Sequence, residues 1–333
     1  MRLRPGLRVL RRSTTEVQVG TDPRWAVRLV DLTPAQVHAL TSLDHTGDLR
    51  APELAPLVGL LDEAGLTTRA AARRVTTGPP GADADAWSLL LADGDGARLV
   101  AARTERAVGV VGLGPTGLGT AVALAAAGVG RVLLDDDGPV RSTDVGPCGY
   151  RWGDIGADRA VVAARILRDT APRVRVDGTE PPDLVVVVEH GAADPARSTV
   201  LLGSGTPHLS VVVREADTVV GPLVVPGGGP CLRCLDLHRA DADPAWPTLV
   251  AQLGATRGPR GAAPRDAVEV GVVAGTCAAL TAAAVLAHLD GVERARAGVT
   301  YEVGVPDAVP RVREWAVHPD CGCTALPVLV GRA

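Results

Sequence analysis

The stretch VGVVGLGPTGLGTAVALAAAGVGRVLLDDDG, residues Val108–Gly138, decides the fold of this chain. Its apolar start is typical of a buried strand, and Gly112, Gly114 and Gly117 then fit the pattern G-x-G-x-x-G. In this pattern the first glycine permits a tight turn, the second lets the backbone approach a phosphate, and the third lets helix and strand pack closely. The alanine-rich run over residues 118–127 predicts a helix whose N-terminus would offer unpaired N–H groups to that phosphate.

Three acidic residues, Asp135, Asp136 and Asp137, end the next predicted strand. Asp135 follows Gly117 by 18 positions, close to the spacing of about 20 at which an acidic side chain binds ribose hydroxyls. The stretch therefore indicates a nucleotide-type fold, with Gly112, Gly114, Gly117, Asp135 and Asp137 as candidate cofactor-binding residues. A tight strand–helix turn without a ligand is an alternative, and so is an NAD(P)-dependent oxidoreductase, which shares the fingerprint.

The composition is that of an ordinary globular protein. The chain has 333 residues, of which 46% are apolar and 22% are charged, so one large domain or two unequal ones can bury a core. Its formal net charge of −4 argues against a nucleic-acid-binding protein. All 34 basic residues are arginines, so no lysine can contact a phosphate.

Two segments bear on localisation. The first residues lack the apolar run of a signal peptide, and we expect a cytoplasmic protein. Residues Val270–Ala287 are uncharged over 18 positions, but they are rich in Ala and Thr and are flanked by Glu269 and His288. We therefore expect a buried core helix in this segment and no association with a membrane.

Residues 1–75 form one compositional unit. Short strand-like runs come first, and two helical patterns follow, the first with Thr33 as N-cap and Pro34 at the first helical position. This order suggests a small winged-helix-like α+β module. Residues 76–105, which begin with many Gly, Pro and Asp, are expected to be a linker and a connecting strand.

The remaining residues, 106–333, are expected to form an α/β domain. Apolar runs alternate there with helical patterns, and strands are predicted at residues 108–111, 131–135, 183–188 and 210–213. Continuous apolar runs such as DLVVVV are typical of strands that are buried on both faces of a parallel sheet.

Four cysteines form two pairs, Cys231-x-x-Cys234 and Cys321-x-Cys323. With 86 residues between them the pairs are too distant for a compact finger, but two such knuckles can meet when the insertion folds between them. Four thiolates suit a tetrahedral Zn²⁺ without an open position, so we predict a structural zinc site. A redox pair and unligated thiols are the alternatives.

Four other residues have side chains that can ligate metals or react. His238 and His318 lie near the cysteine pairs in the sequence and are spare candidate ligands. Cys148 and Cys277 have no partner at a metal-binding spacing, and Cys277 is predicted to be a core residue because it lies within an apolar helix.

The order of these features resembles the ThiF/MoeB-type family, the bacterial relatives of ubiquitin-activating enzymes. The resemblance runs from about Arg106 to Cys323, and the cysteine quartet is its most specific element. Such proteins use ATP and Mg²⁺ to adenylate the C-terminal carboxylate of a small protein or peptide. The resemblance implies a Rossmann-like ThiF-type domain, a structural Zn²⁺ and a homodimer.

The N-terminal module extends this comparison. A small winged-helix-like module before a ThiF-like domain resembles the leader-peptide-binding proteins of pathways that make azol(in)e-containing ribosomal peptides. There a PqqD-like module captures the leader of a precursor peptide as an added strand on a sheet edge. The resemblance implies a precursor or leader peptide and a YcaO-type modifying enzyme as partners.

The sequence departs from the catalytic family at the residues that contact ATP. The family has S-N-L-x-R-Q after the strand-end acids, and its arginine and a later lysine bind the phosphates. Here Thr143 and Gly146 replace the asparagine and the arginine, and Arg159 stands at the lysine position. Arg141 and Arg151 are further candidates for a phosphate contact.

A second departure follows the apolar run DLVVVV. The family has D-x-T-D-N there, with an aspartate that organises Mg²⁺, whereas this chain has Glu189, His190 and Gly191. The Glu189 carboxylate is a group that Mg²⁺ could bind.

Two functions follow from these departures. The first is a scaffold that binds a leader peptide and presents it to a partner enzyme, with degenerate or weak adenylation chemistry. The second is an active adenylyltransferase in which Glu189, Arg159 and Arg151 are the catalytic residues. The sequence shows no evident transfer cysteine, and a plain interaction domain without a ligand is the remaining alternative.

Overall fold

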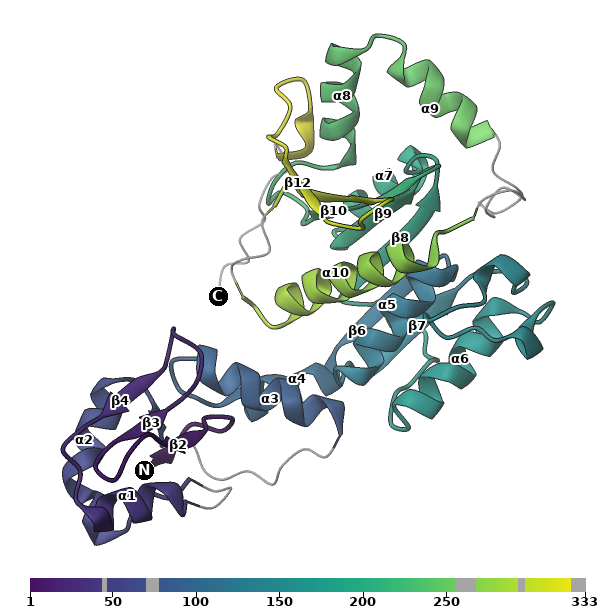
Figure 1. The fold of residues 1–333 in the computed structure, drawn as a ribbon. Helices are drawn as coiled ribbons and strands as arrows, with labels where there is room; N and C mark the ends of the chain where they lie inside the picture. The colour runs from purple at the N-terminus through teal and green to yellow at the C-terminus, as the bar shows by residue number, and fades with distance from the viewer. Residues whose placement is uncertain (44–46, 70–77, 256–267, 293–296, 325–333) are drawn as a thin grey trace, which may run out of the picture. The chain divides into compact units, whose positions relative to one another are not determined.

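The computed structural model describes residues 1–43, 47–69, 78–255, 268–292 and 297–324 (Figure 1). The chain divides into two compact units, Met1–Ala102 and Arg103–Ala333. Residues 70–77, which cover the end of the expected N-terminal module and the start of the expected linker, lie outside the described residues.

The first unit contains two small antiparallel sheets, one with strand order β2-β3-β4 and one formed by β1 and β5. In β3, Val17 and Val19 are completely buried, and they belong to an apolar cluster with leucines of the helices. The strands are β1 (Arg2–Leu3), β2 (Val9–Arg11), β3 (Val17–Val19), β4 (Val27–Leu29) and β5 (Thr67–Thr68).

The first helix of this unit begins as its sequence predicts. The Thr33 hydroxyl accepts a hydrogen bond from the Gln36 amide, and the Gln36 side chain accepts one from the Thr33 amide, which makes a reciprocal capping box. The helices of the unit are α1 (Pro34–Thr41), α2 (Ala55–Glu63), α3 (Pro79–Leu90) and α4 (Gly96–Ala102).

Helix α3 covers residues that we expected to belong to a linker and a connecting strand. Pro79 and Pro80 occupy its first positions, where a missing N–H costs nothing, and Gly78 precedes them with a positive φ of 90°. The alanines that follow are strong helix formers. The Gly-Pro cluster therefore marks the start of a helix in this chain.

The second unit is built on a seven-stranded mixed sheet with the order β12-β11-β10-β9-β8-β6-β7. The pairs β7–β6, β6–β8 and β8–β9 are parallel, and the remaining pairs are antiparallel. This result confirms the predicted α/β fold. The strands are β6 (Ala107–Val111), β7 (Arg131–Asp135), β8 (Leu184–His190), β9 (His208–Val213), β10 (Asp217–Val224), β11 (Val299–Gly304) and β12 (Arg311–Glu314).

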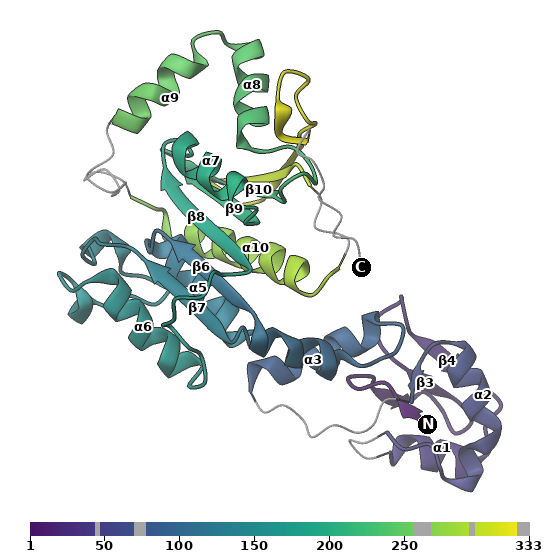
Figure 2. The ribbon, with the colours of Figure 1, turned by 180° about the vertical axis from the view of Figure 1, so that it is seen from behind.

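Helices cover both faces of this sheet. Figures 1 and 2 show α5 and α10 together on one face and α7 on the other. Val108 and Val110 of β6 and Leu184 and Val186 of β8 are completely buried in the main apolar cluster. The helices are α5 (Pro115–Ala126), α6 (Arg159–Thr170), α7 (Pro195–Gly203), α8 (Leu232–Ala242), α9 (Trp246–Ala255) and α10 (Gly271–Leu289).

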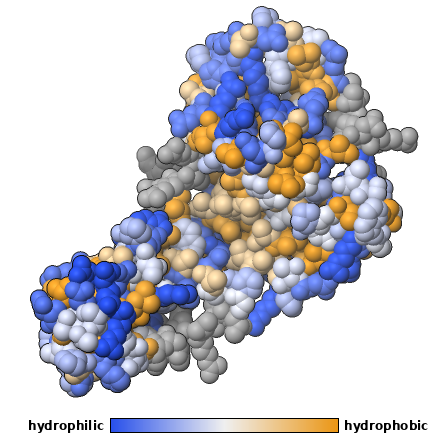
Figure 3. Space-filling model, viewed as in Figure 1, coloured by the Kyte–Doolittle hydropathy of each residue, from blue (hydrophilic) through white to orange (hydrophobic). Residues whose placement is uncertain are grey.

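Helix α10 contains the uncharged segment for which the sequence predicts a buried core helix. By length and composition alone it could cross a membrane, and 39% of its most apolar window is buried. Val273 and Cys277 on its inner side belong to the main core, whereas Val272, Ala279 and Ala283 are exposed. Figure 3 shows weakly hydrophobic atoms gathered over this helix.

The topology fixes where a ligand site belongs. Strand β6 comes first in the sequence of this sheet, yet it lies between β7 and β8. The chain runs from β6 to β7 on one side and then returns past β6 to β8 on the other, so the carboxyl ends of β6 and β8 border a switch point, where ligands bind in open α/β sheets. The glycine loop follows β6 at this place.

Candidate functional site

The glycine loop has the geometry that its sequence predicts. Gly112 has a φ of 83°, in the left-handed region, and its amide donates to the Asp135 carbonyl at 2.9 Å. A Cβ at Gly112 would overlap the Val188 carbonyl oxygen of β8, and one at Gly117 would overlap the Gly112 carbonyl oxygen. Gly114 is the N-cap residue of α5 and has no side chain to cap it. The glycines thus permit the turn and the close packing of the helix on the sheet.

The second acid after β7 is part of the loop itself. Asp136 accepts hydrogen bonds from the amides of Leu113 and Gly138, both at 2.7 Å. Arg159 Nη1 lies 3.3 Å from the same carboxylate, and Arg159 also binds Asp144 with its Nε and Nη2 at 3.0 and 2.6 Å. Only 6% of Arg159 is exposed. Burial lowers the pKa of this guanidinium, but the two carboxylates outweigh it and raise the pKa overall.

The other residues predicted to contact a phosphate or a ribose lie at different places in the structure. Asp135 and Asp137 are exposed at the carboxyl end of β7, beside the loop. Arg151 is also exposed, in the segment that leads to α6. The structure therefore brings Gly112 and its neighbours together with the strand-end acids, whereas Arg159 is held in a buried ion pair and Arg151 extends into solvent.

Glu189 and His190 lie on opposite faces of the sheet, because successive residues of a strand alternate. The Glu189 carboxylate accepts a hydrogen bond from the Asp194 amide at 2.9 Å and pairs with Arg197 at 3.3 Å, beside α7. His190 Nε2 lies 3.9 Å from Oε1 of Glu269, a residue that contacts the start of α5. Burial, followed by the charges of Arg159 and Arg141, lowers the pKa of His190 to about 4, so its imidazole is neutral at pH 7.

A further carboxylate, that of Glu269 just before α10, contacts the start of α5. Its Oε2 accepts hydrogen bonds from the Thr116 amide at 2.9 Å and from the Thr116 hydroxyl at 2.5 Å. Its Oε1 lies where a Cβ of residue 114 would stand, and it is 3.9 Å from His190 Nε2. The side chain is 3% exposed, and burial raises the pKa of its carboxyl group, although the bonds from Thr116 oppose this.

In the sequence Glu269 stands out only as the residue that flanks the apolar helix. It follows Gly117 by about 150 positions in sequence, and no motif of the loop includes it. The only available signal was a single carboxylate at the start of an otherwise uncharged segment.

Neither isolated thiol is suited to a nucleophilic role. Burial raises the pKa of Cys148 to about 11, with a further contribution from Glu269. Burial likewise raises the pKa of Cys277 to about 12, and this residue is completely buried in α10. Both groups are therefore thiols at neutral pH, whereas the thiolate is the reactive form.

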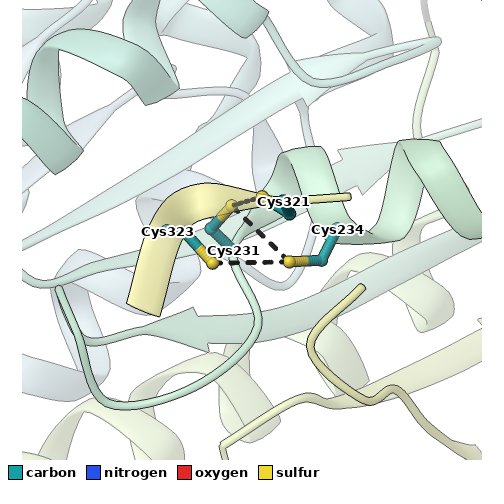
Figure 4. Close-up of side chains that lie close together, drawn as sticks. All are labelled: Cys231, Cys234, Cys321 and Cys323. Atoms are coloured by element: carbon teal, nitrogen blue, oxygen red, sulfur yellow. Dashed lines mark hydrogen bonds between the residues drawn. The ribbon is translucent and has the colours of Figure 1, made fainter. Parts of the chain in front are cut away.

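The four paired cysteines meet in a second site. Cys231 and Cys234 come from the start of α8, and Cys321 and Cys323 from the turn after β12 (Figure 4). The Sγ–Sγ distances are 3.9 Å from Cys231 to Cys234, 3.7 Å from Cys231 to Cys321, and 3.4 Å from Cys234 to Cys323. A tetrahedral Zn²⁺ with Zn–S bonds of about 2.3 Å places its sulfurs about 3.8 Å apart. The quartet therefore fits such an ion, and all four residues are buried.

The two spare histidines lie beside this quartet. His318 Nε2 is 2.9 Å from Asp241 Oδ2, and its Nδ1 accepts from the Asp320 amide at 3.1 Å. His238 Nε2 lies 3.1 Å from the Ala316 carbonyl oxygen. The two histidines and Asp241 have ligand atoms close enough together to hold a metal ion. The atoms named above, however, already take part in hydrogen bonds within the chain.

Comparison with known proteins agrees with this architecture. The sequence model of the ThiF family matches residues 94–182, which include the glycine loop and the strand-end acids. Over these residues the resemblance to this family is confirmed. None of the curated proteins matches the chain.

Three solved structures illustrate the likeness in fold. Escherichia coli MccB with ATP has a TM-score of 0.65 at 16% identity, covering 97% of this chain and 98% of MccB. The microcin C7 biosynthetic enzyme MccB in complex with N-formylated MccA has a TM-score of 0.64 at 16% identity, covering 97% and 98%. PaaA has a TM-score of 0.66 at 14% identity, covering 93% of this chain and 99% of PaaA. At these identities the likeness establishes the shared fold.

Proposed function

The chain contains a ThiF family domain, and from this premise we propose that it is a scaffold with degenerate adenylation chemistry. It binds the leader of a ribosomally made precursor peptide and presents that peptide to a modifying enzyme. In this proposal the first unit is the peptide-recognition module, and the nucleotide-type fold of the second unit serves mainly as a rigid support.

The observation that supports the proposal is that side chains of the protein itself bind the groups of the glycine loop that would bind a phosphate. The Thr116 amide and hydroxyl, which would face a phosphate, both bind Glu269. Arg159 is committed to Asp144 and Asp136, and the Glu189 carboxylate lies at α7. Adenylyl transfer depends on positive charge and a metal ion held around the phosphates. Because Arg159 and Glu189 already bind other groups of the chain, few side chains are left to supply that charge or to hold the metal.

The peptide partner is supported by the fold. MccB shares this fold over almost its whole length and has been solved with MccA. Addition of a strand to an open sheet edge is a general way to bind an extended peptide. In the described part of the first unit, β2 and β4 form the two edges of the three-stranded sheet.

The register shows which amides of β2 face outward. The Arg12 amide binds the Glu16 carbonyl, and the Gly20 amide binds the Arg8 carbonyl, at the two ends of the β2–β3 ladder. Because bonded and non-bonded pairs alternate in an antiparallel ladder, the amides of Val9 and Arg11 point away from β3. They are placed to pair with an added strand.

The test is calorimetric titration of the full chain with the precursor peptides encoded beside its gene. We expect one of them to bind and to slow amide hydrogen exchange in β2 or β4. A failure of every such peptide to bind rejects the scaffold function. Binding that leaves both edge strands unprotected rejects the edge as the docking place.

An active adenylyltransferase is the second candidate, favoured by the likeness to MccB solved with ATP. In this case Glu189, Arg159 and Arg151 would take the catalytic roles, with ATP and Mg²⁺ bound at the glycine loop. It predicts ATP–pyrophosphate exchange that depends on an acceptor with a free C-terminus and that is abolished by Glu189→Ala. Absence of exchange with any acceptor that binds the chain counts against it.

The cysteine quartet completes the proposal. The sulfur atoms of Cys231, Cys234, Cys321 and Cys323 would hold one Zn²⁺, which ties the start of α8 to the turn after β12. With four thiolates around it the ion would have no open position, so its role would be structural. A cytoplasmic homodimer that works beside a YcaO-type enzyme is the corresponding cellular setting.

A further inference from the structure

The N-terminus of α5 is the place where this fold offers its backbone to an anion. Unpaired amides and the helix dipole favour negative charge there, and nucleotide phosphates bind such sites in related folds. In this chain the anion at that place is Glu269, whose Oε2 accepts from both donors of Thr116. A phosphate would need the same donors.

The second oxygen of Glu269 is an independent sign that the position is built for more than a cap. Oε1 is buried and accepts no hydrogen bond among the described residues. It stands directly over Gly114, so that a Cβ at this position would overlap it. The second glycine of the fingerprint thus gives room to Glu269, where it would otherwise let the backbone approach a phosphate.

An ordinary cap does not explain this arrangement. Helices are usually capped by the side chain of the N-cap residue itself, whereas the cap of α5 comes from a residue far along the sequence. Leaving a buried oxygen without a hydrogen-bond partner destabilises the folded chain. A carboxylate placed this way fills the volume and takes the donors of a phosphate.

Several nearby charges oppose a second anion, although Arg141 lies close enough for its positive charge to act on His190. Asp136 and Asp144 share Arg159, and His190 is uncharged at neutral pH. Two negative charges held close together in a buried site repel each other strongly, because little water screens them. A phosphate and the Glu269 carboxylate therefore exclude each other at the helix terminus.

We propose that Glu269 is a built-in occupant of the phosphate site, which keeps nucleotides out of the glycine loop while it remains in this position. The proposal goes beyond the scaffold function, because it identifies the side chain that decides whether this fold binds a nucleotide. It does not depend on which peptide the first unit recognises.

The experiment measures binding of ATP with Mg²⁺, and separately of inorganic pyrophosphate, to four full-length proteins at one salt concentration. They are the wild type, Glu269→Ala, Glu269→Gln and Glu63→Ala. The last variant removes the same charge from an exposed position of α2 in the first unit. We expect Glu269→Ala to bind both probes at least about tenfold more tightly than the wild type, a factor that equals about 1.4 kcal/mol.

Glu269→Gln separates charge from volume. It keeps the shape of the side chain and an acceptor for Thr116 but loses the negative charge, so we expect an affinity between those of the wild type and of Glu269→Ala. We expect Glu63→Ala to behave as the wild type. Urea unfolding of each variant shows whether it is folded, and if Glu269→Ala is not, the isosteric Glu269→Gln decides.

The proposal is overturned if a folded Glu269→Ala protein, or a folded Glu269→Gln protein where Glu269→Ala does not fold, binds both probes no more tightly than the wild type. This outcome leaves the scaffold function unaffected, since that function is tested by peptide titration. Conversely, failure of all peptides to bind leaves the role of Glu269 standing.

Discussion

The cysteine quartet and the glycine loop lie in the same unit, and each is assembled from segments far apart in the sequence. In the quartet every member is of the residue type that the site needs, and the four sulfur atoms meet at distances that suit one metal ion. In the loop the backbone is formed as its pattern predicts, but a carboxylate stands at the place of the ligand. In the quartet the distant segment supplies the missing ligands, whereas in the glycine loop the distant residue Glu269 takes the place of a ligand.

The contrast between the two sites shows how much a sequence motif says about a bound ligand. A metal motif consists of the ligands themselves, so its presence and its chemistry are nearly the same observation. A glycine fingerprint records only that a turn is tight and that a helix lies close to a strand. Gly112 and Gly117 serve this packing whether or not a phosphate is present, because the neighbours that they admit are backbone atoms of this chain.

The largest expected effect concerns the quartet. Cys234→Ser removes one of four ligands from a fully buried position, and we expect loss of bound zinc and a loss of stability of about 5 kcal/mol or more. Metal analysis of the purified chain and urea unfolding measure the two quantities. Cys148→Ser is the matched control, because it also changes a buried cysteine but one outside the quartet. A Cys234→Ser protein with full zinc content contradicts the assignment.

The next effect tests whether Arg159 belongs to the fold or to a phosphate. Arg159→Gln leaves Asp144 and Asp136 without their buried cation, and we expect a loss of about 3–5 kcal/mol in the free energy of unfolding. Arg151→Gln, at an exposed position, should change stability by less than about 0.5 kcal/mol. Equal stability of the two variants would show that the Arg159 pair is not part of the structural core.

A third effect concerns the glycines alone. Gly117→Ala puts a methyl group against the Gly112 carbonyl oxygen, and we expect it to destabilise the protein by about 3 kcal/mol without any nucleotide present. At Gly153 a Cβ meets nothing within 4 Å, and Gly153→Ala should be close to neutral. Urea unfolding in nucleotide-free buffer measures both. A neutral Gly117→Ala would mean that the third glycine is not required for packing.

Much of the fold could be predicted because its signals are local. The apolar runs placed β6, β7, β8 and β9 to within a few residues, and Thr33 with Pro34 marked the start of α1. Helix α3 was missed for a local reason as well. A Gly-Pro cluster has the same composition at a helix start as in a linker. Only the alanines that follow it distinguish the two cases.

The contacts of the candidate site could not be predicted, because they depend on which distant segments meet. Nothing near Glu269 in the sequence indicates that it reaches Thr116, and nothing near Arg159 indicates that Asp144 will bind it. The face of the sheet on which Glu189 or His190 lies depends on the register of β8, which a continuous apolar run does not reveal. Sequence therefore located the loop but not the side chains that occupy it.

The smallest expected effect is on the pH dependence of stability, and it comes from His190, the neutral side chain beside Glu269. The pKa of His190 is about 4 in the folded chain, against 6.5 as its ordinary value, because burial disfavours the imidazolium. As the pH falls from 6.5 toward 4, the unfolded chain binds a proton that the folded chain does not, so stability is lost in this window. At pH 5 the loss from this residue is about 2 kcal/mol relative to pH 8.

Replacing the titratable ring isolates this term from the other groups that titrate. His190→Gln has no proton to bind, so its stability should fall less between pH 8 and pH 5 than that of the wild type, by about the same 2 kcal/mol. Urea unfolding at the two pH values measures both differences, and the contributions of the other acidic groups and histidines cancel between the proteins. Identical pH dependence would mean that His190 can take up a proton while folded. Below about pH 6.5 the loop would then carry a positive charge beside Glu269, and the electrostatic case against a second anion would weaken there.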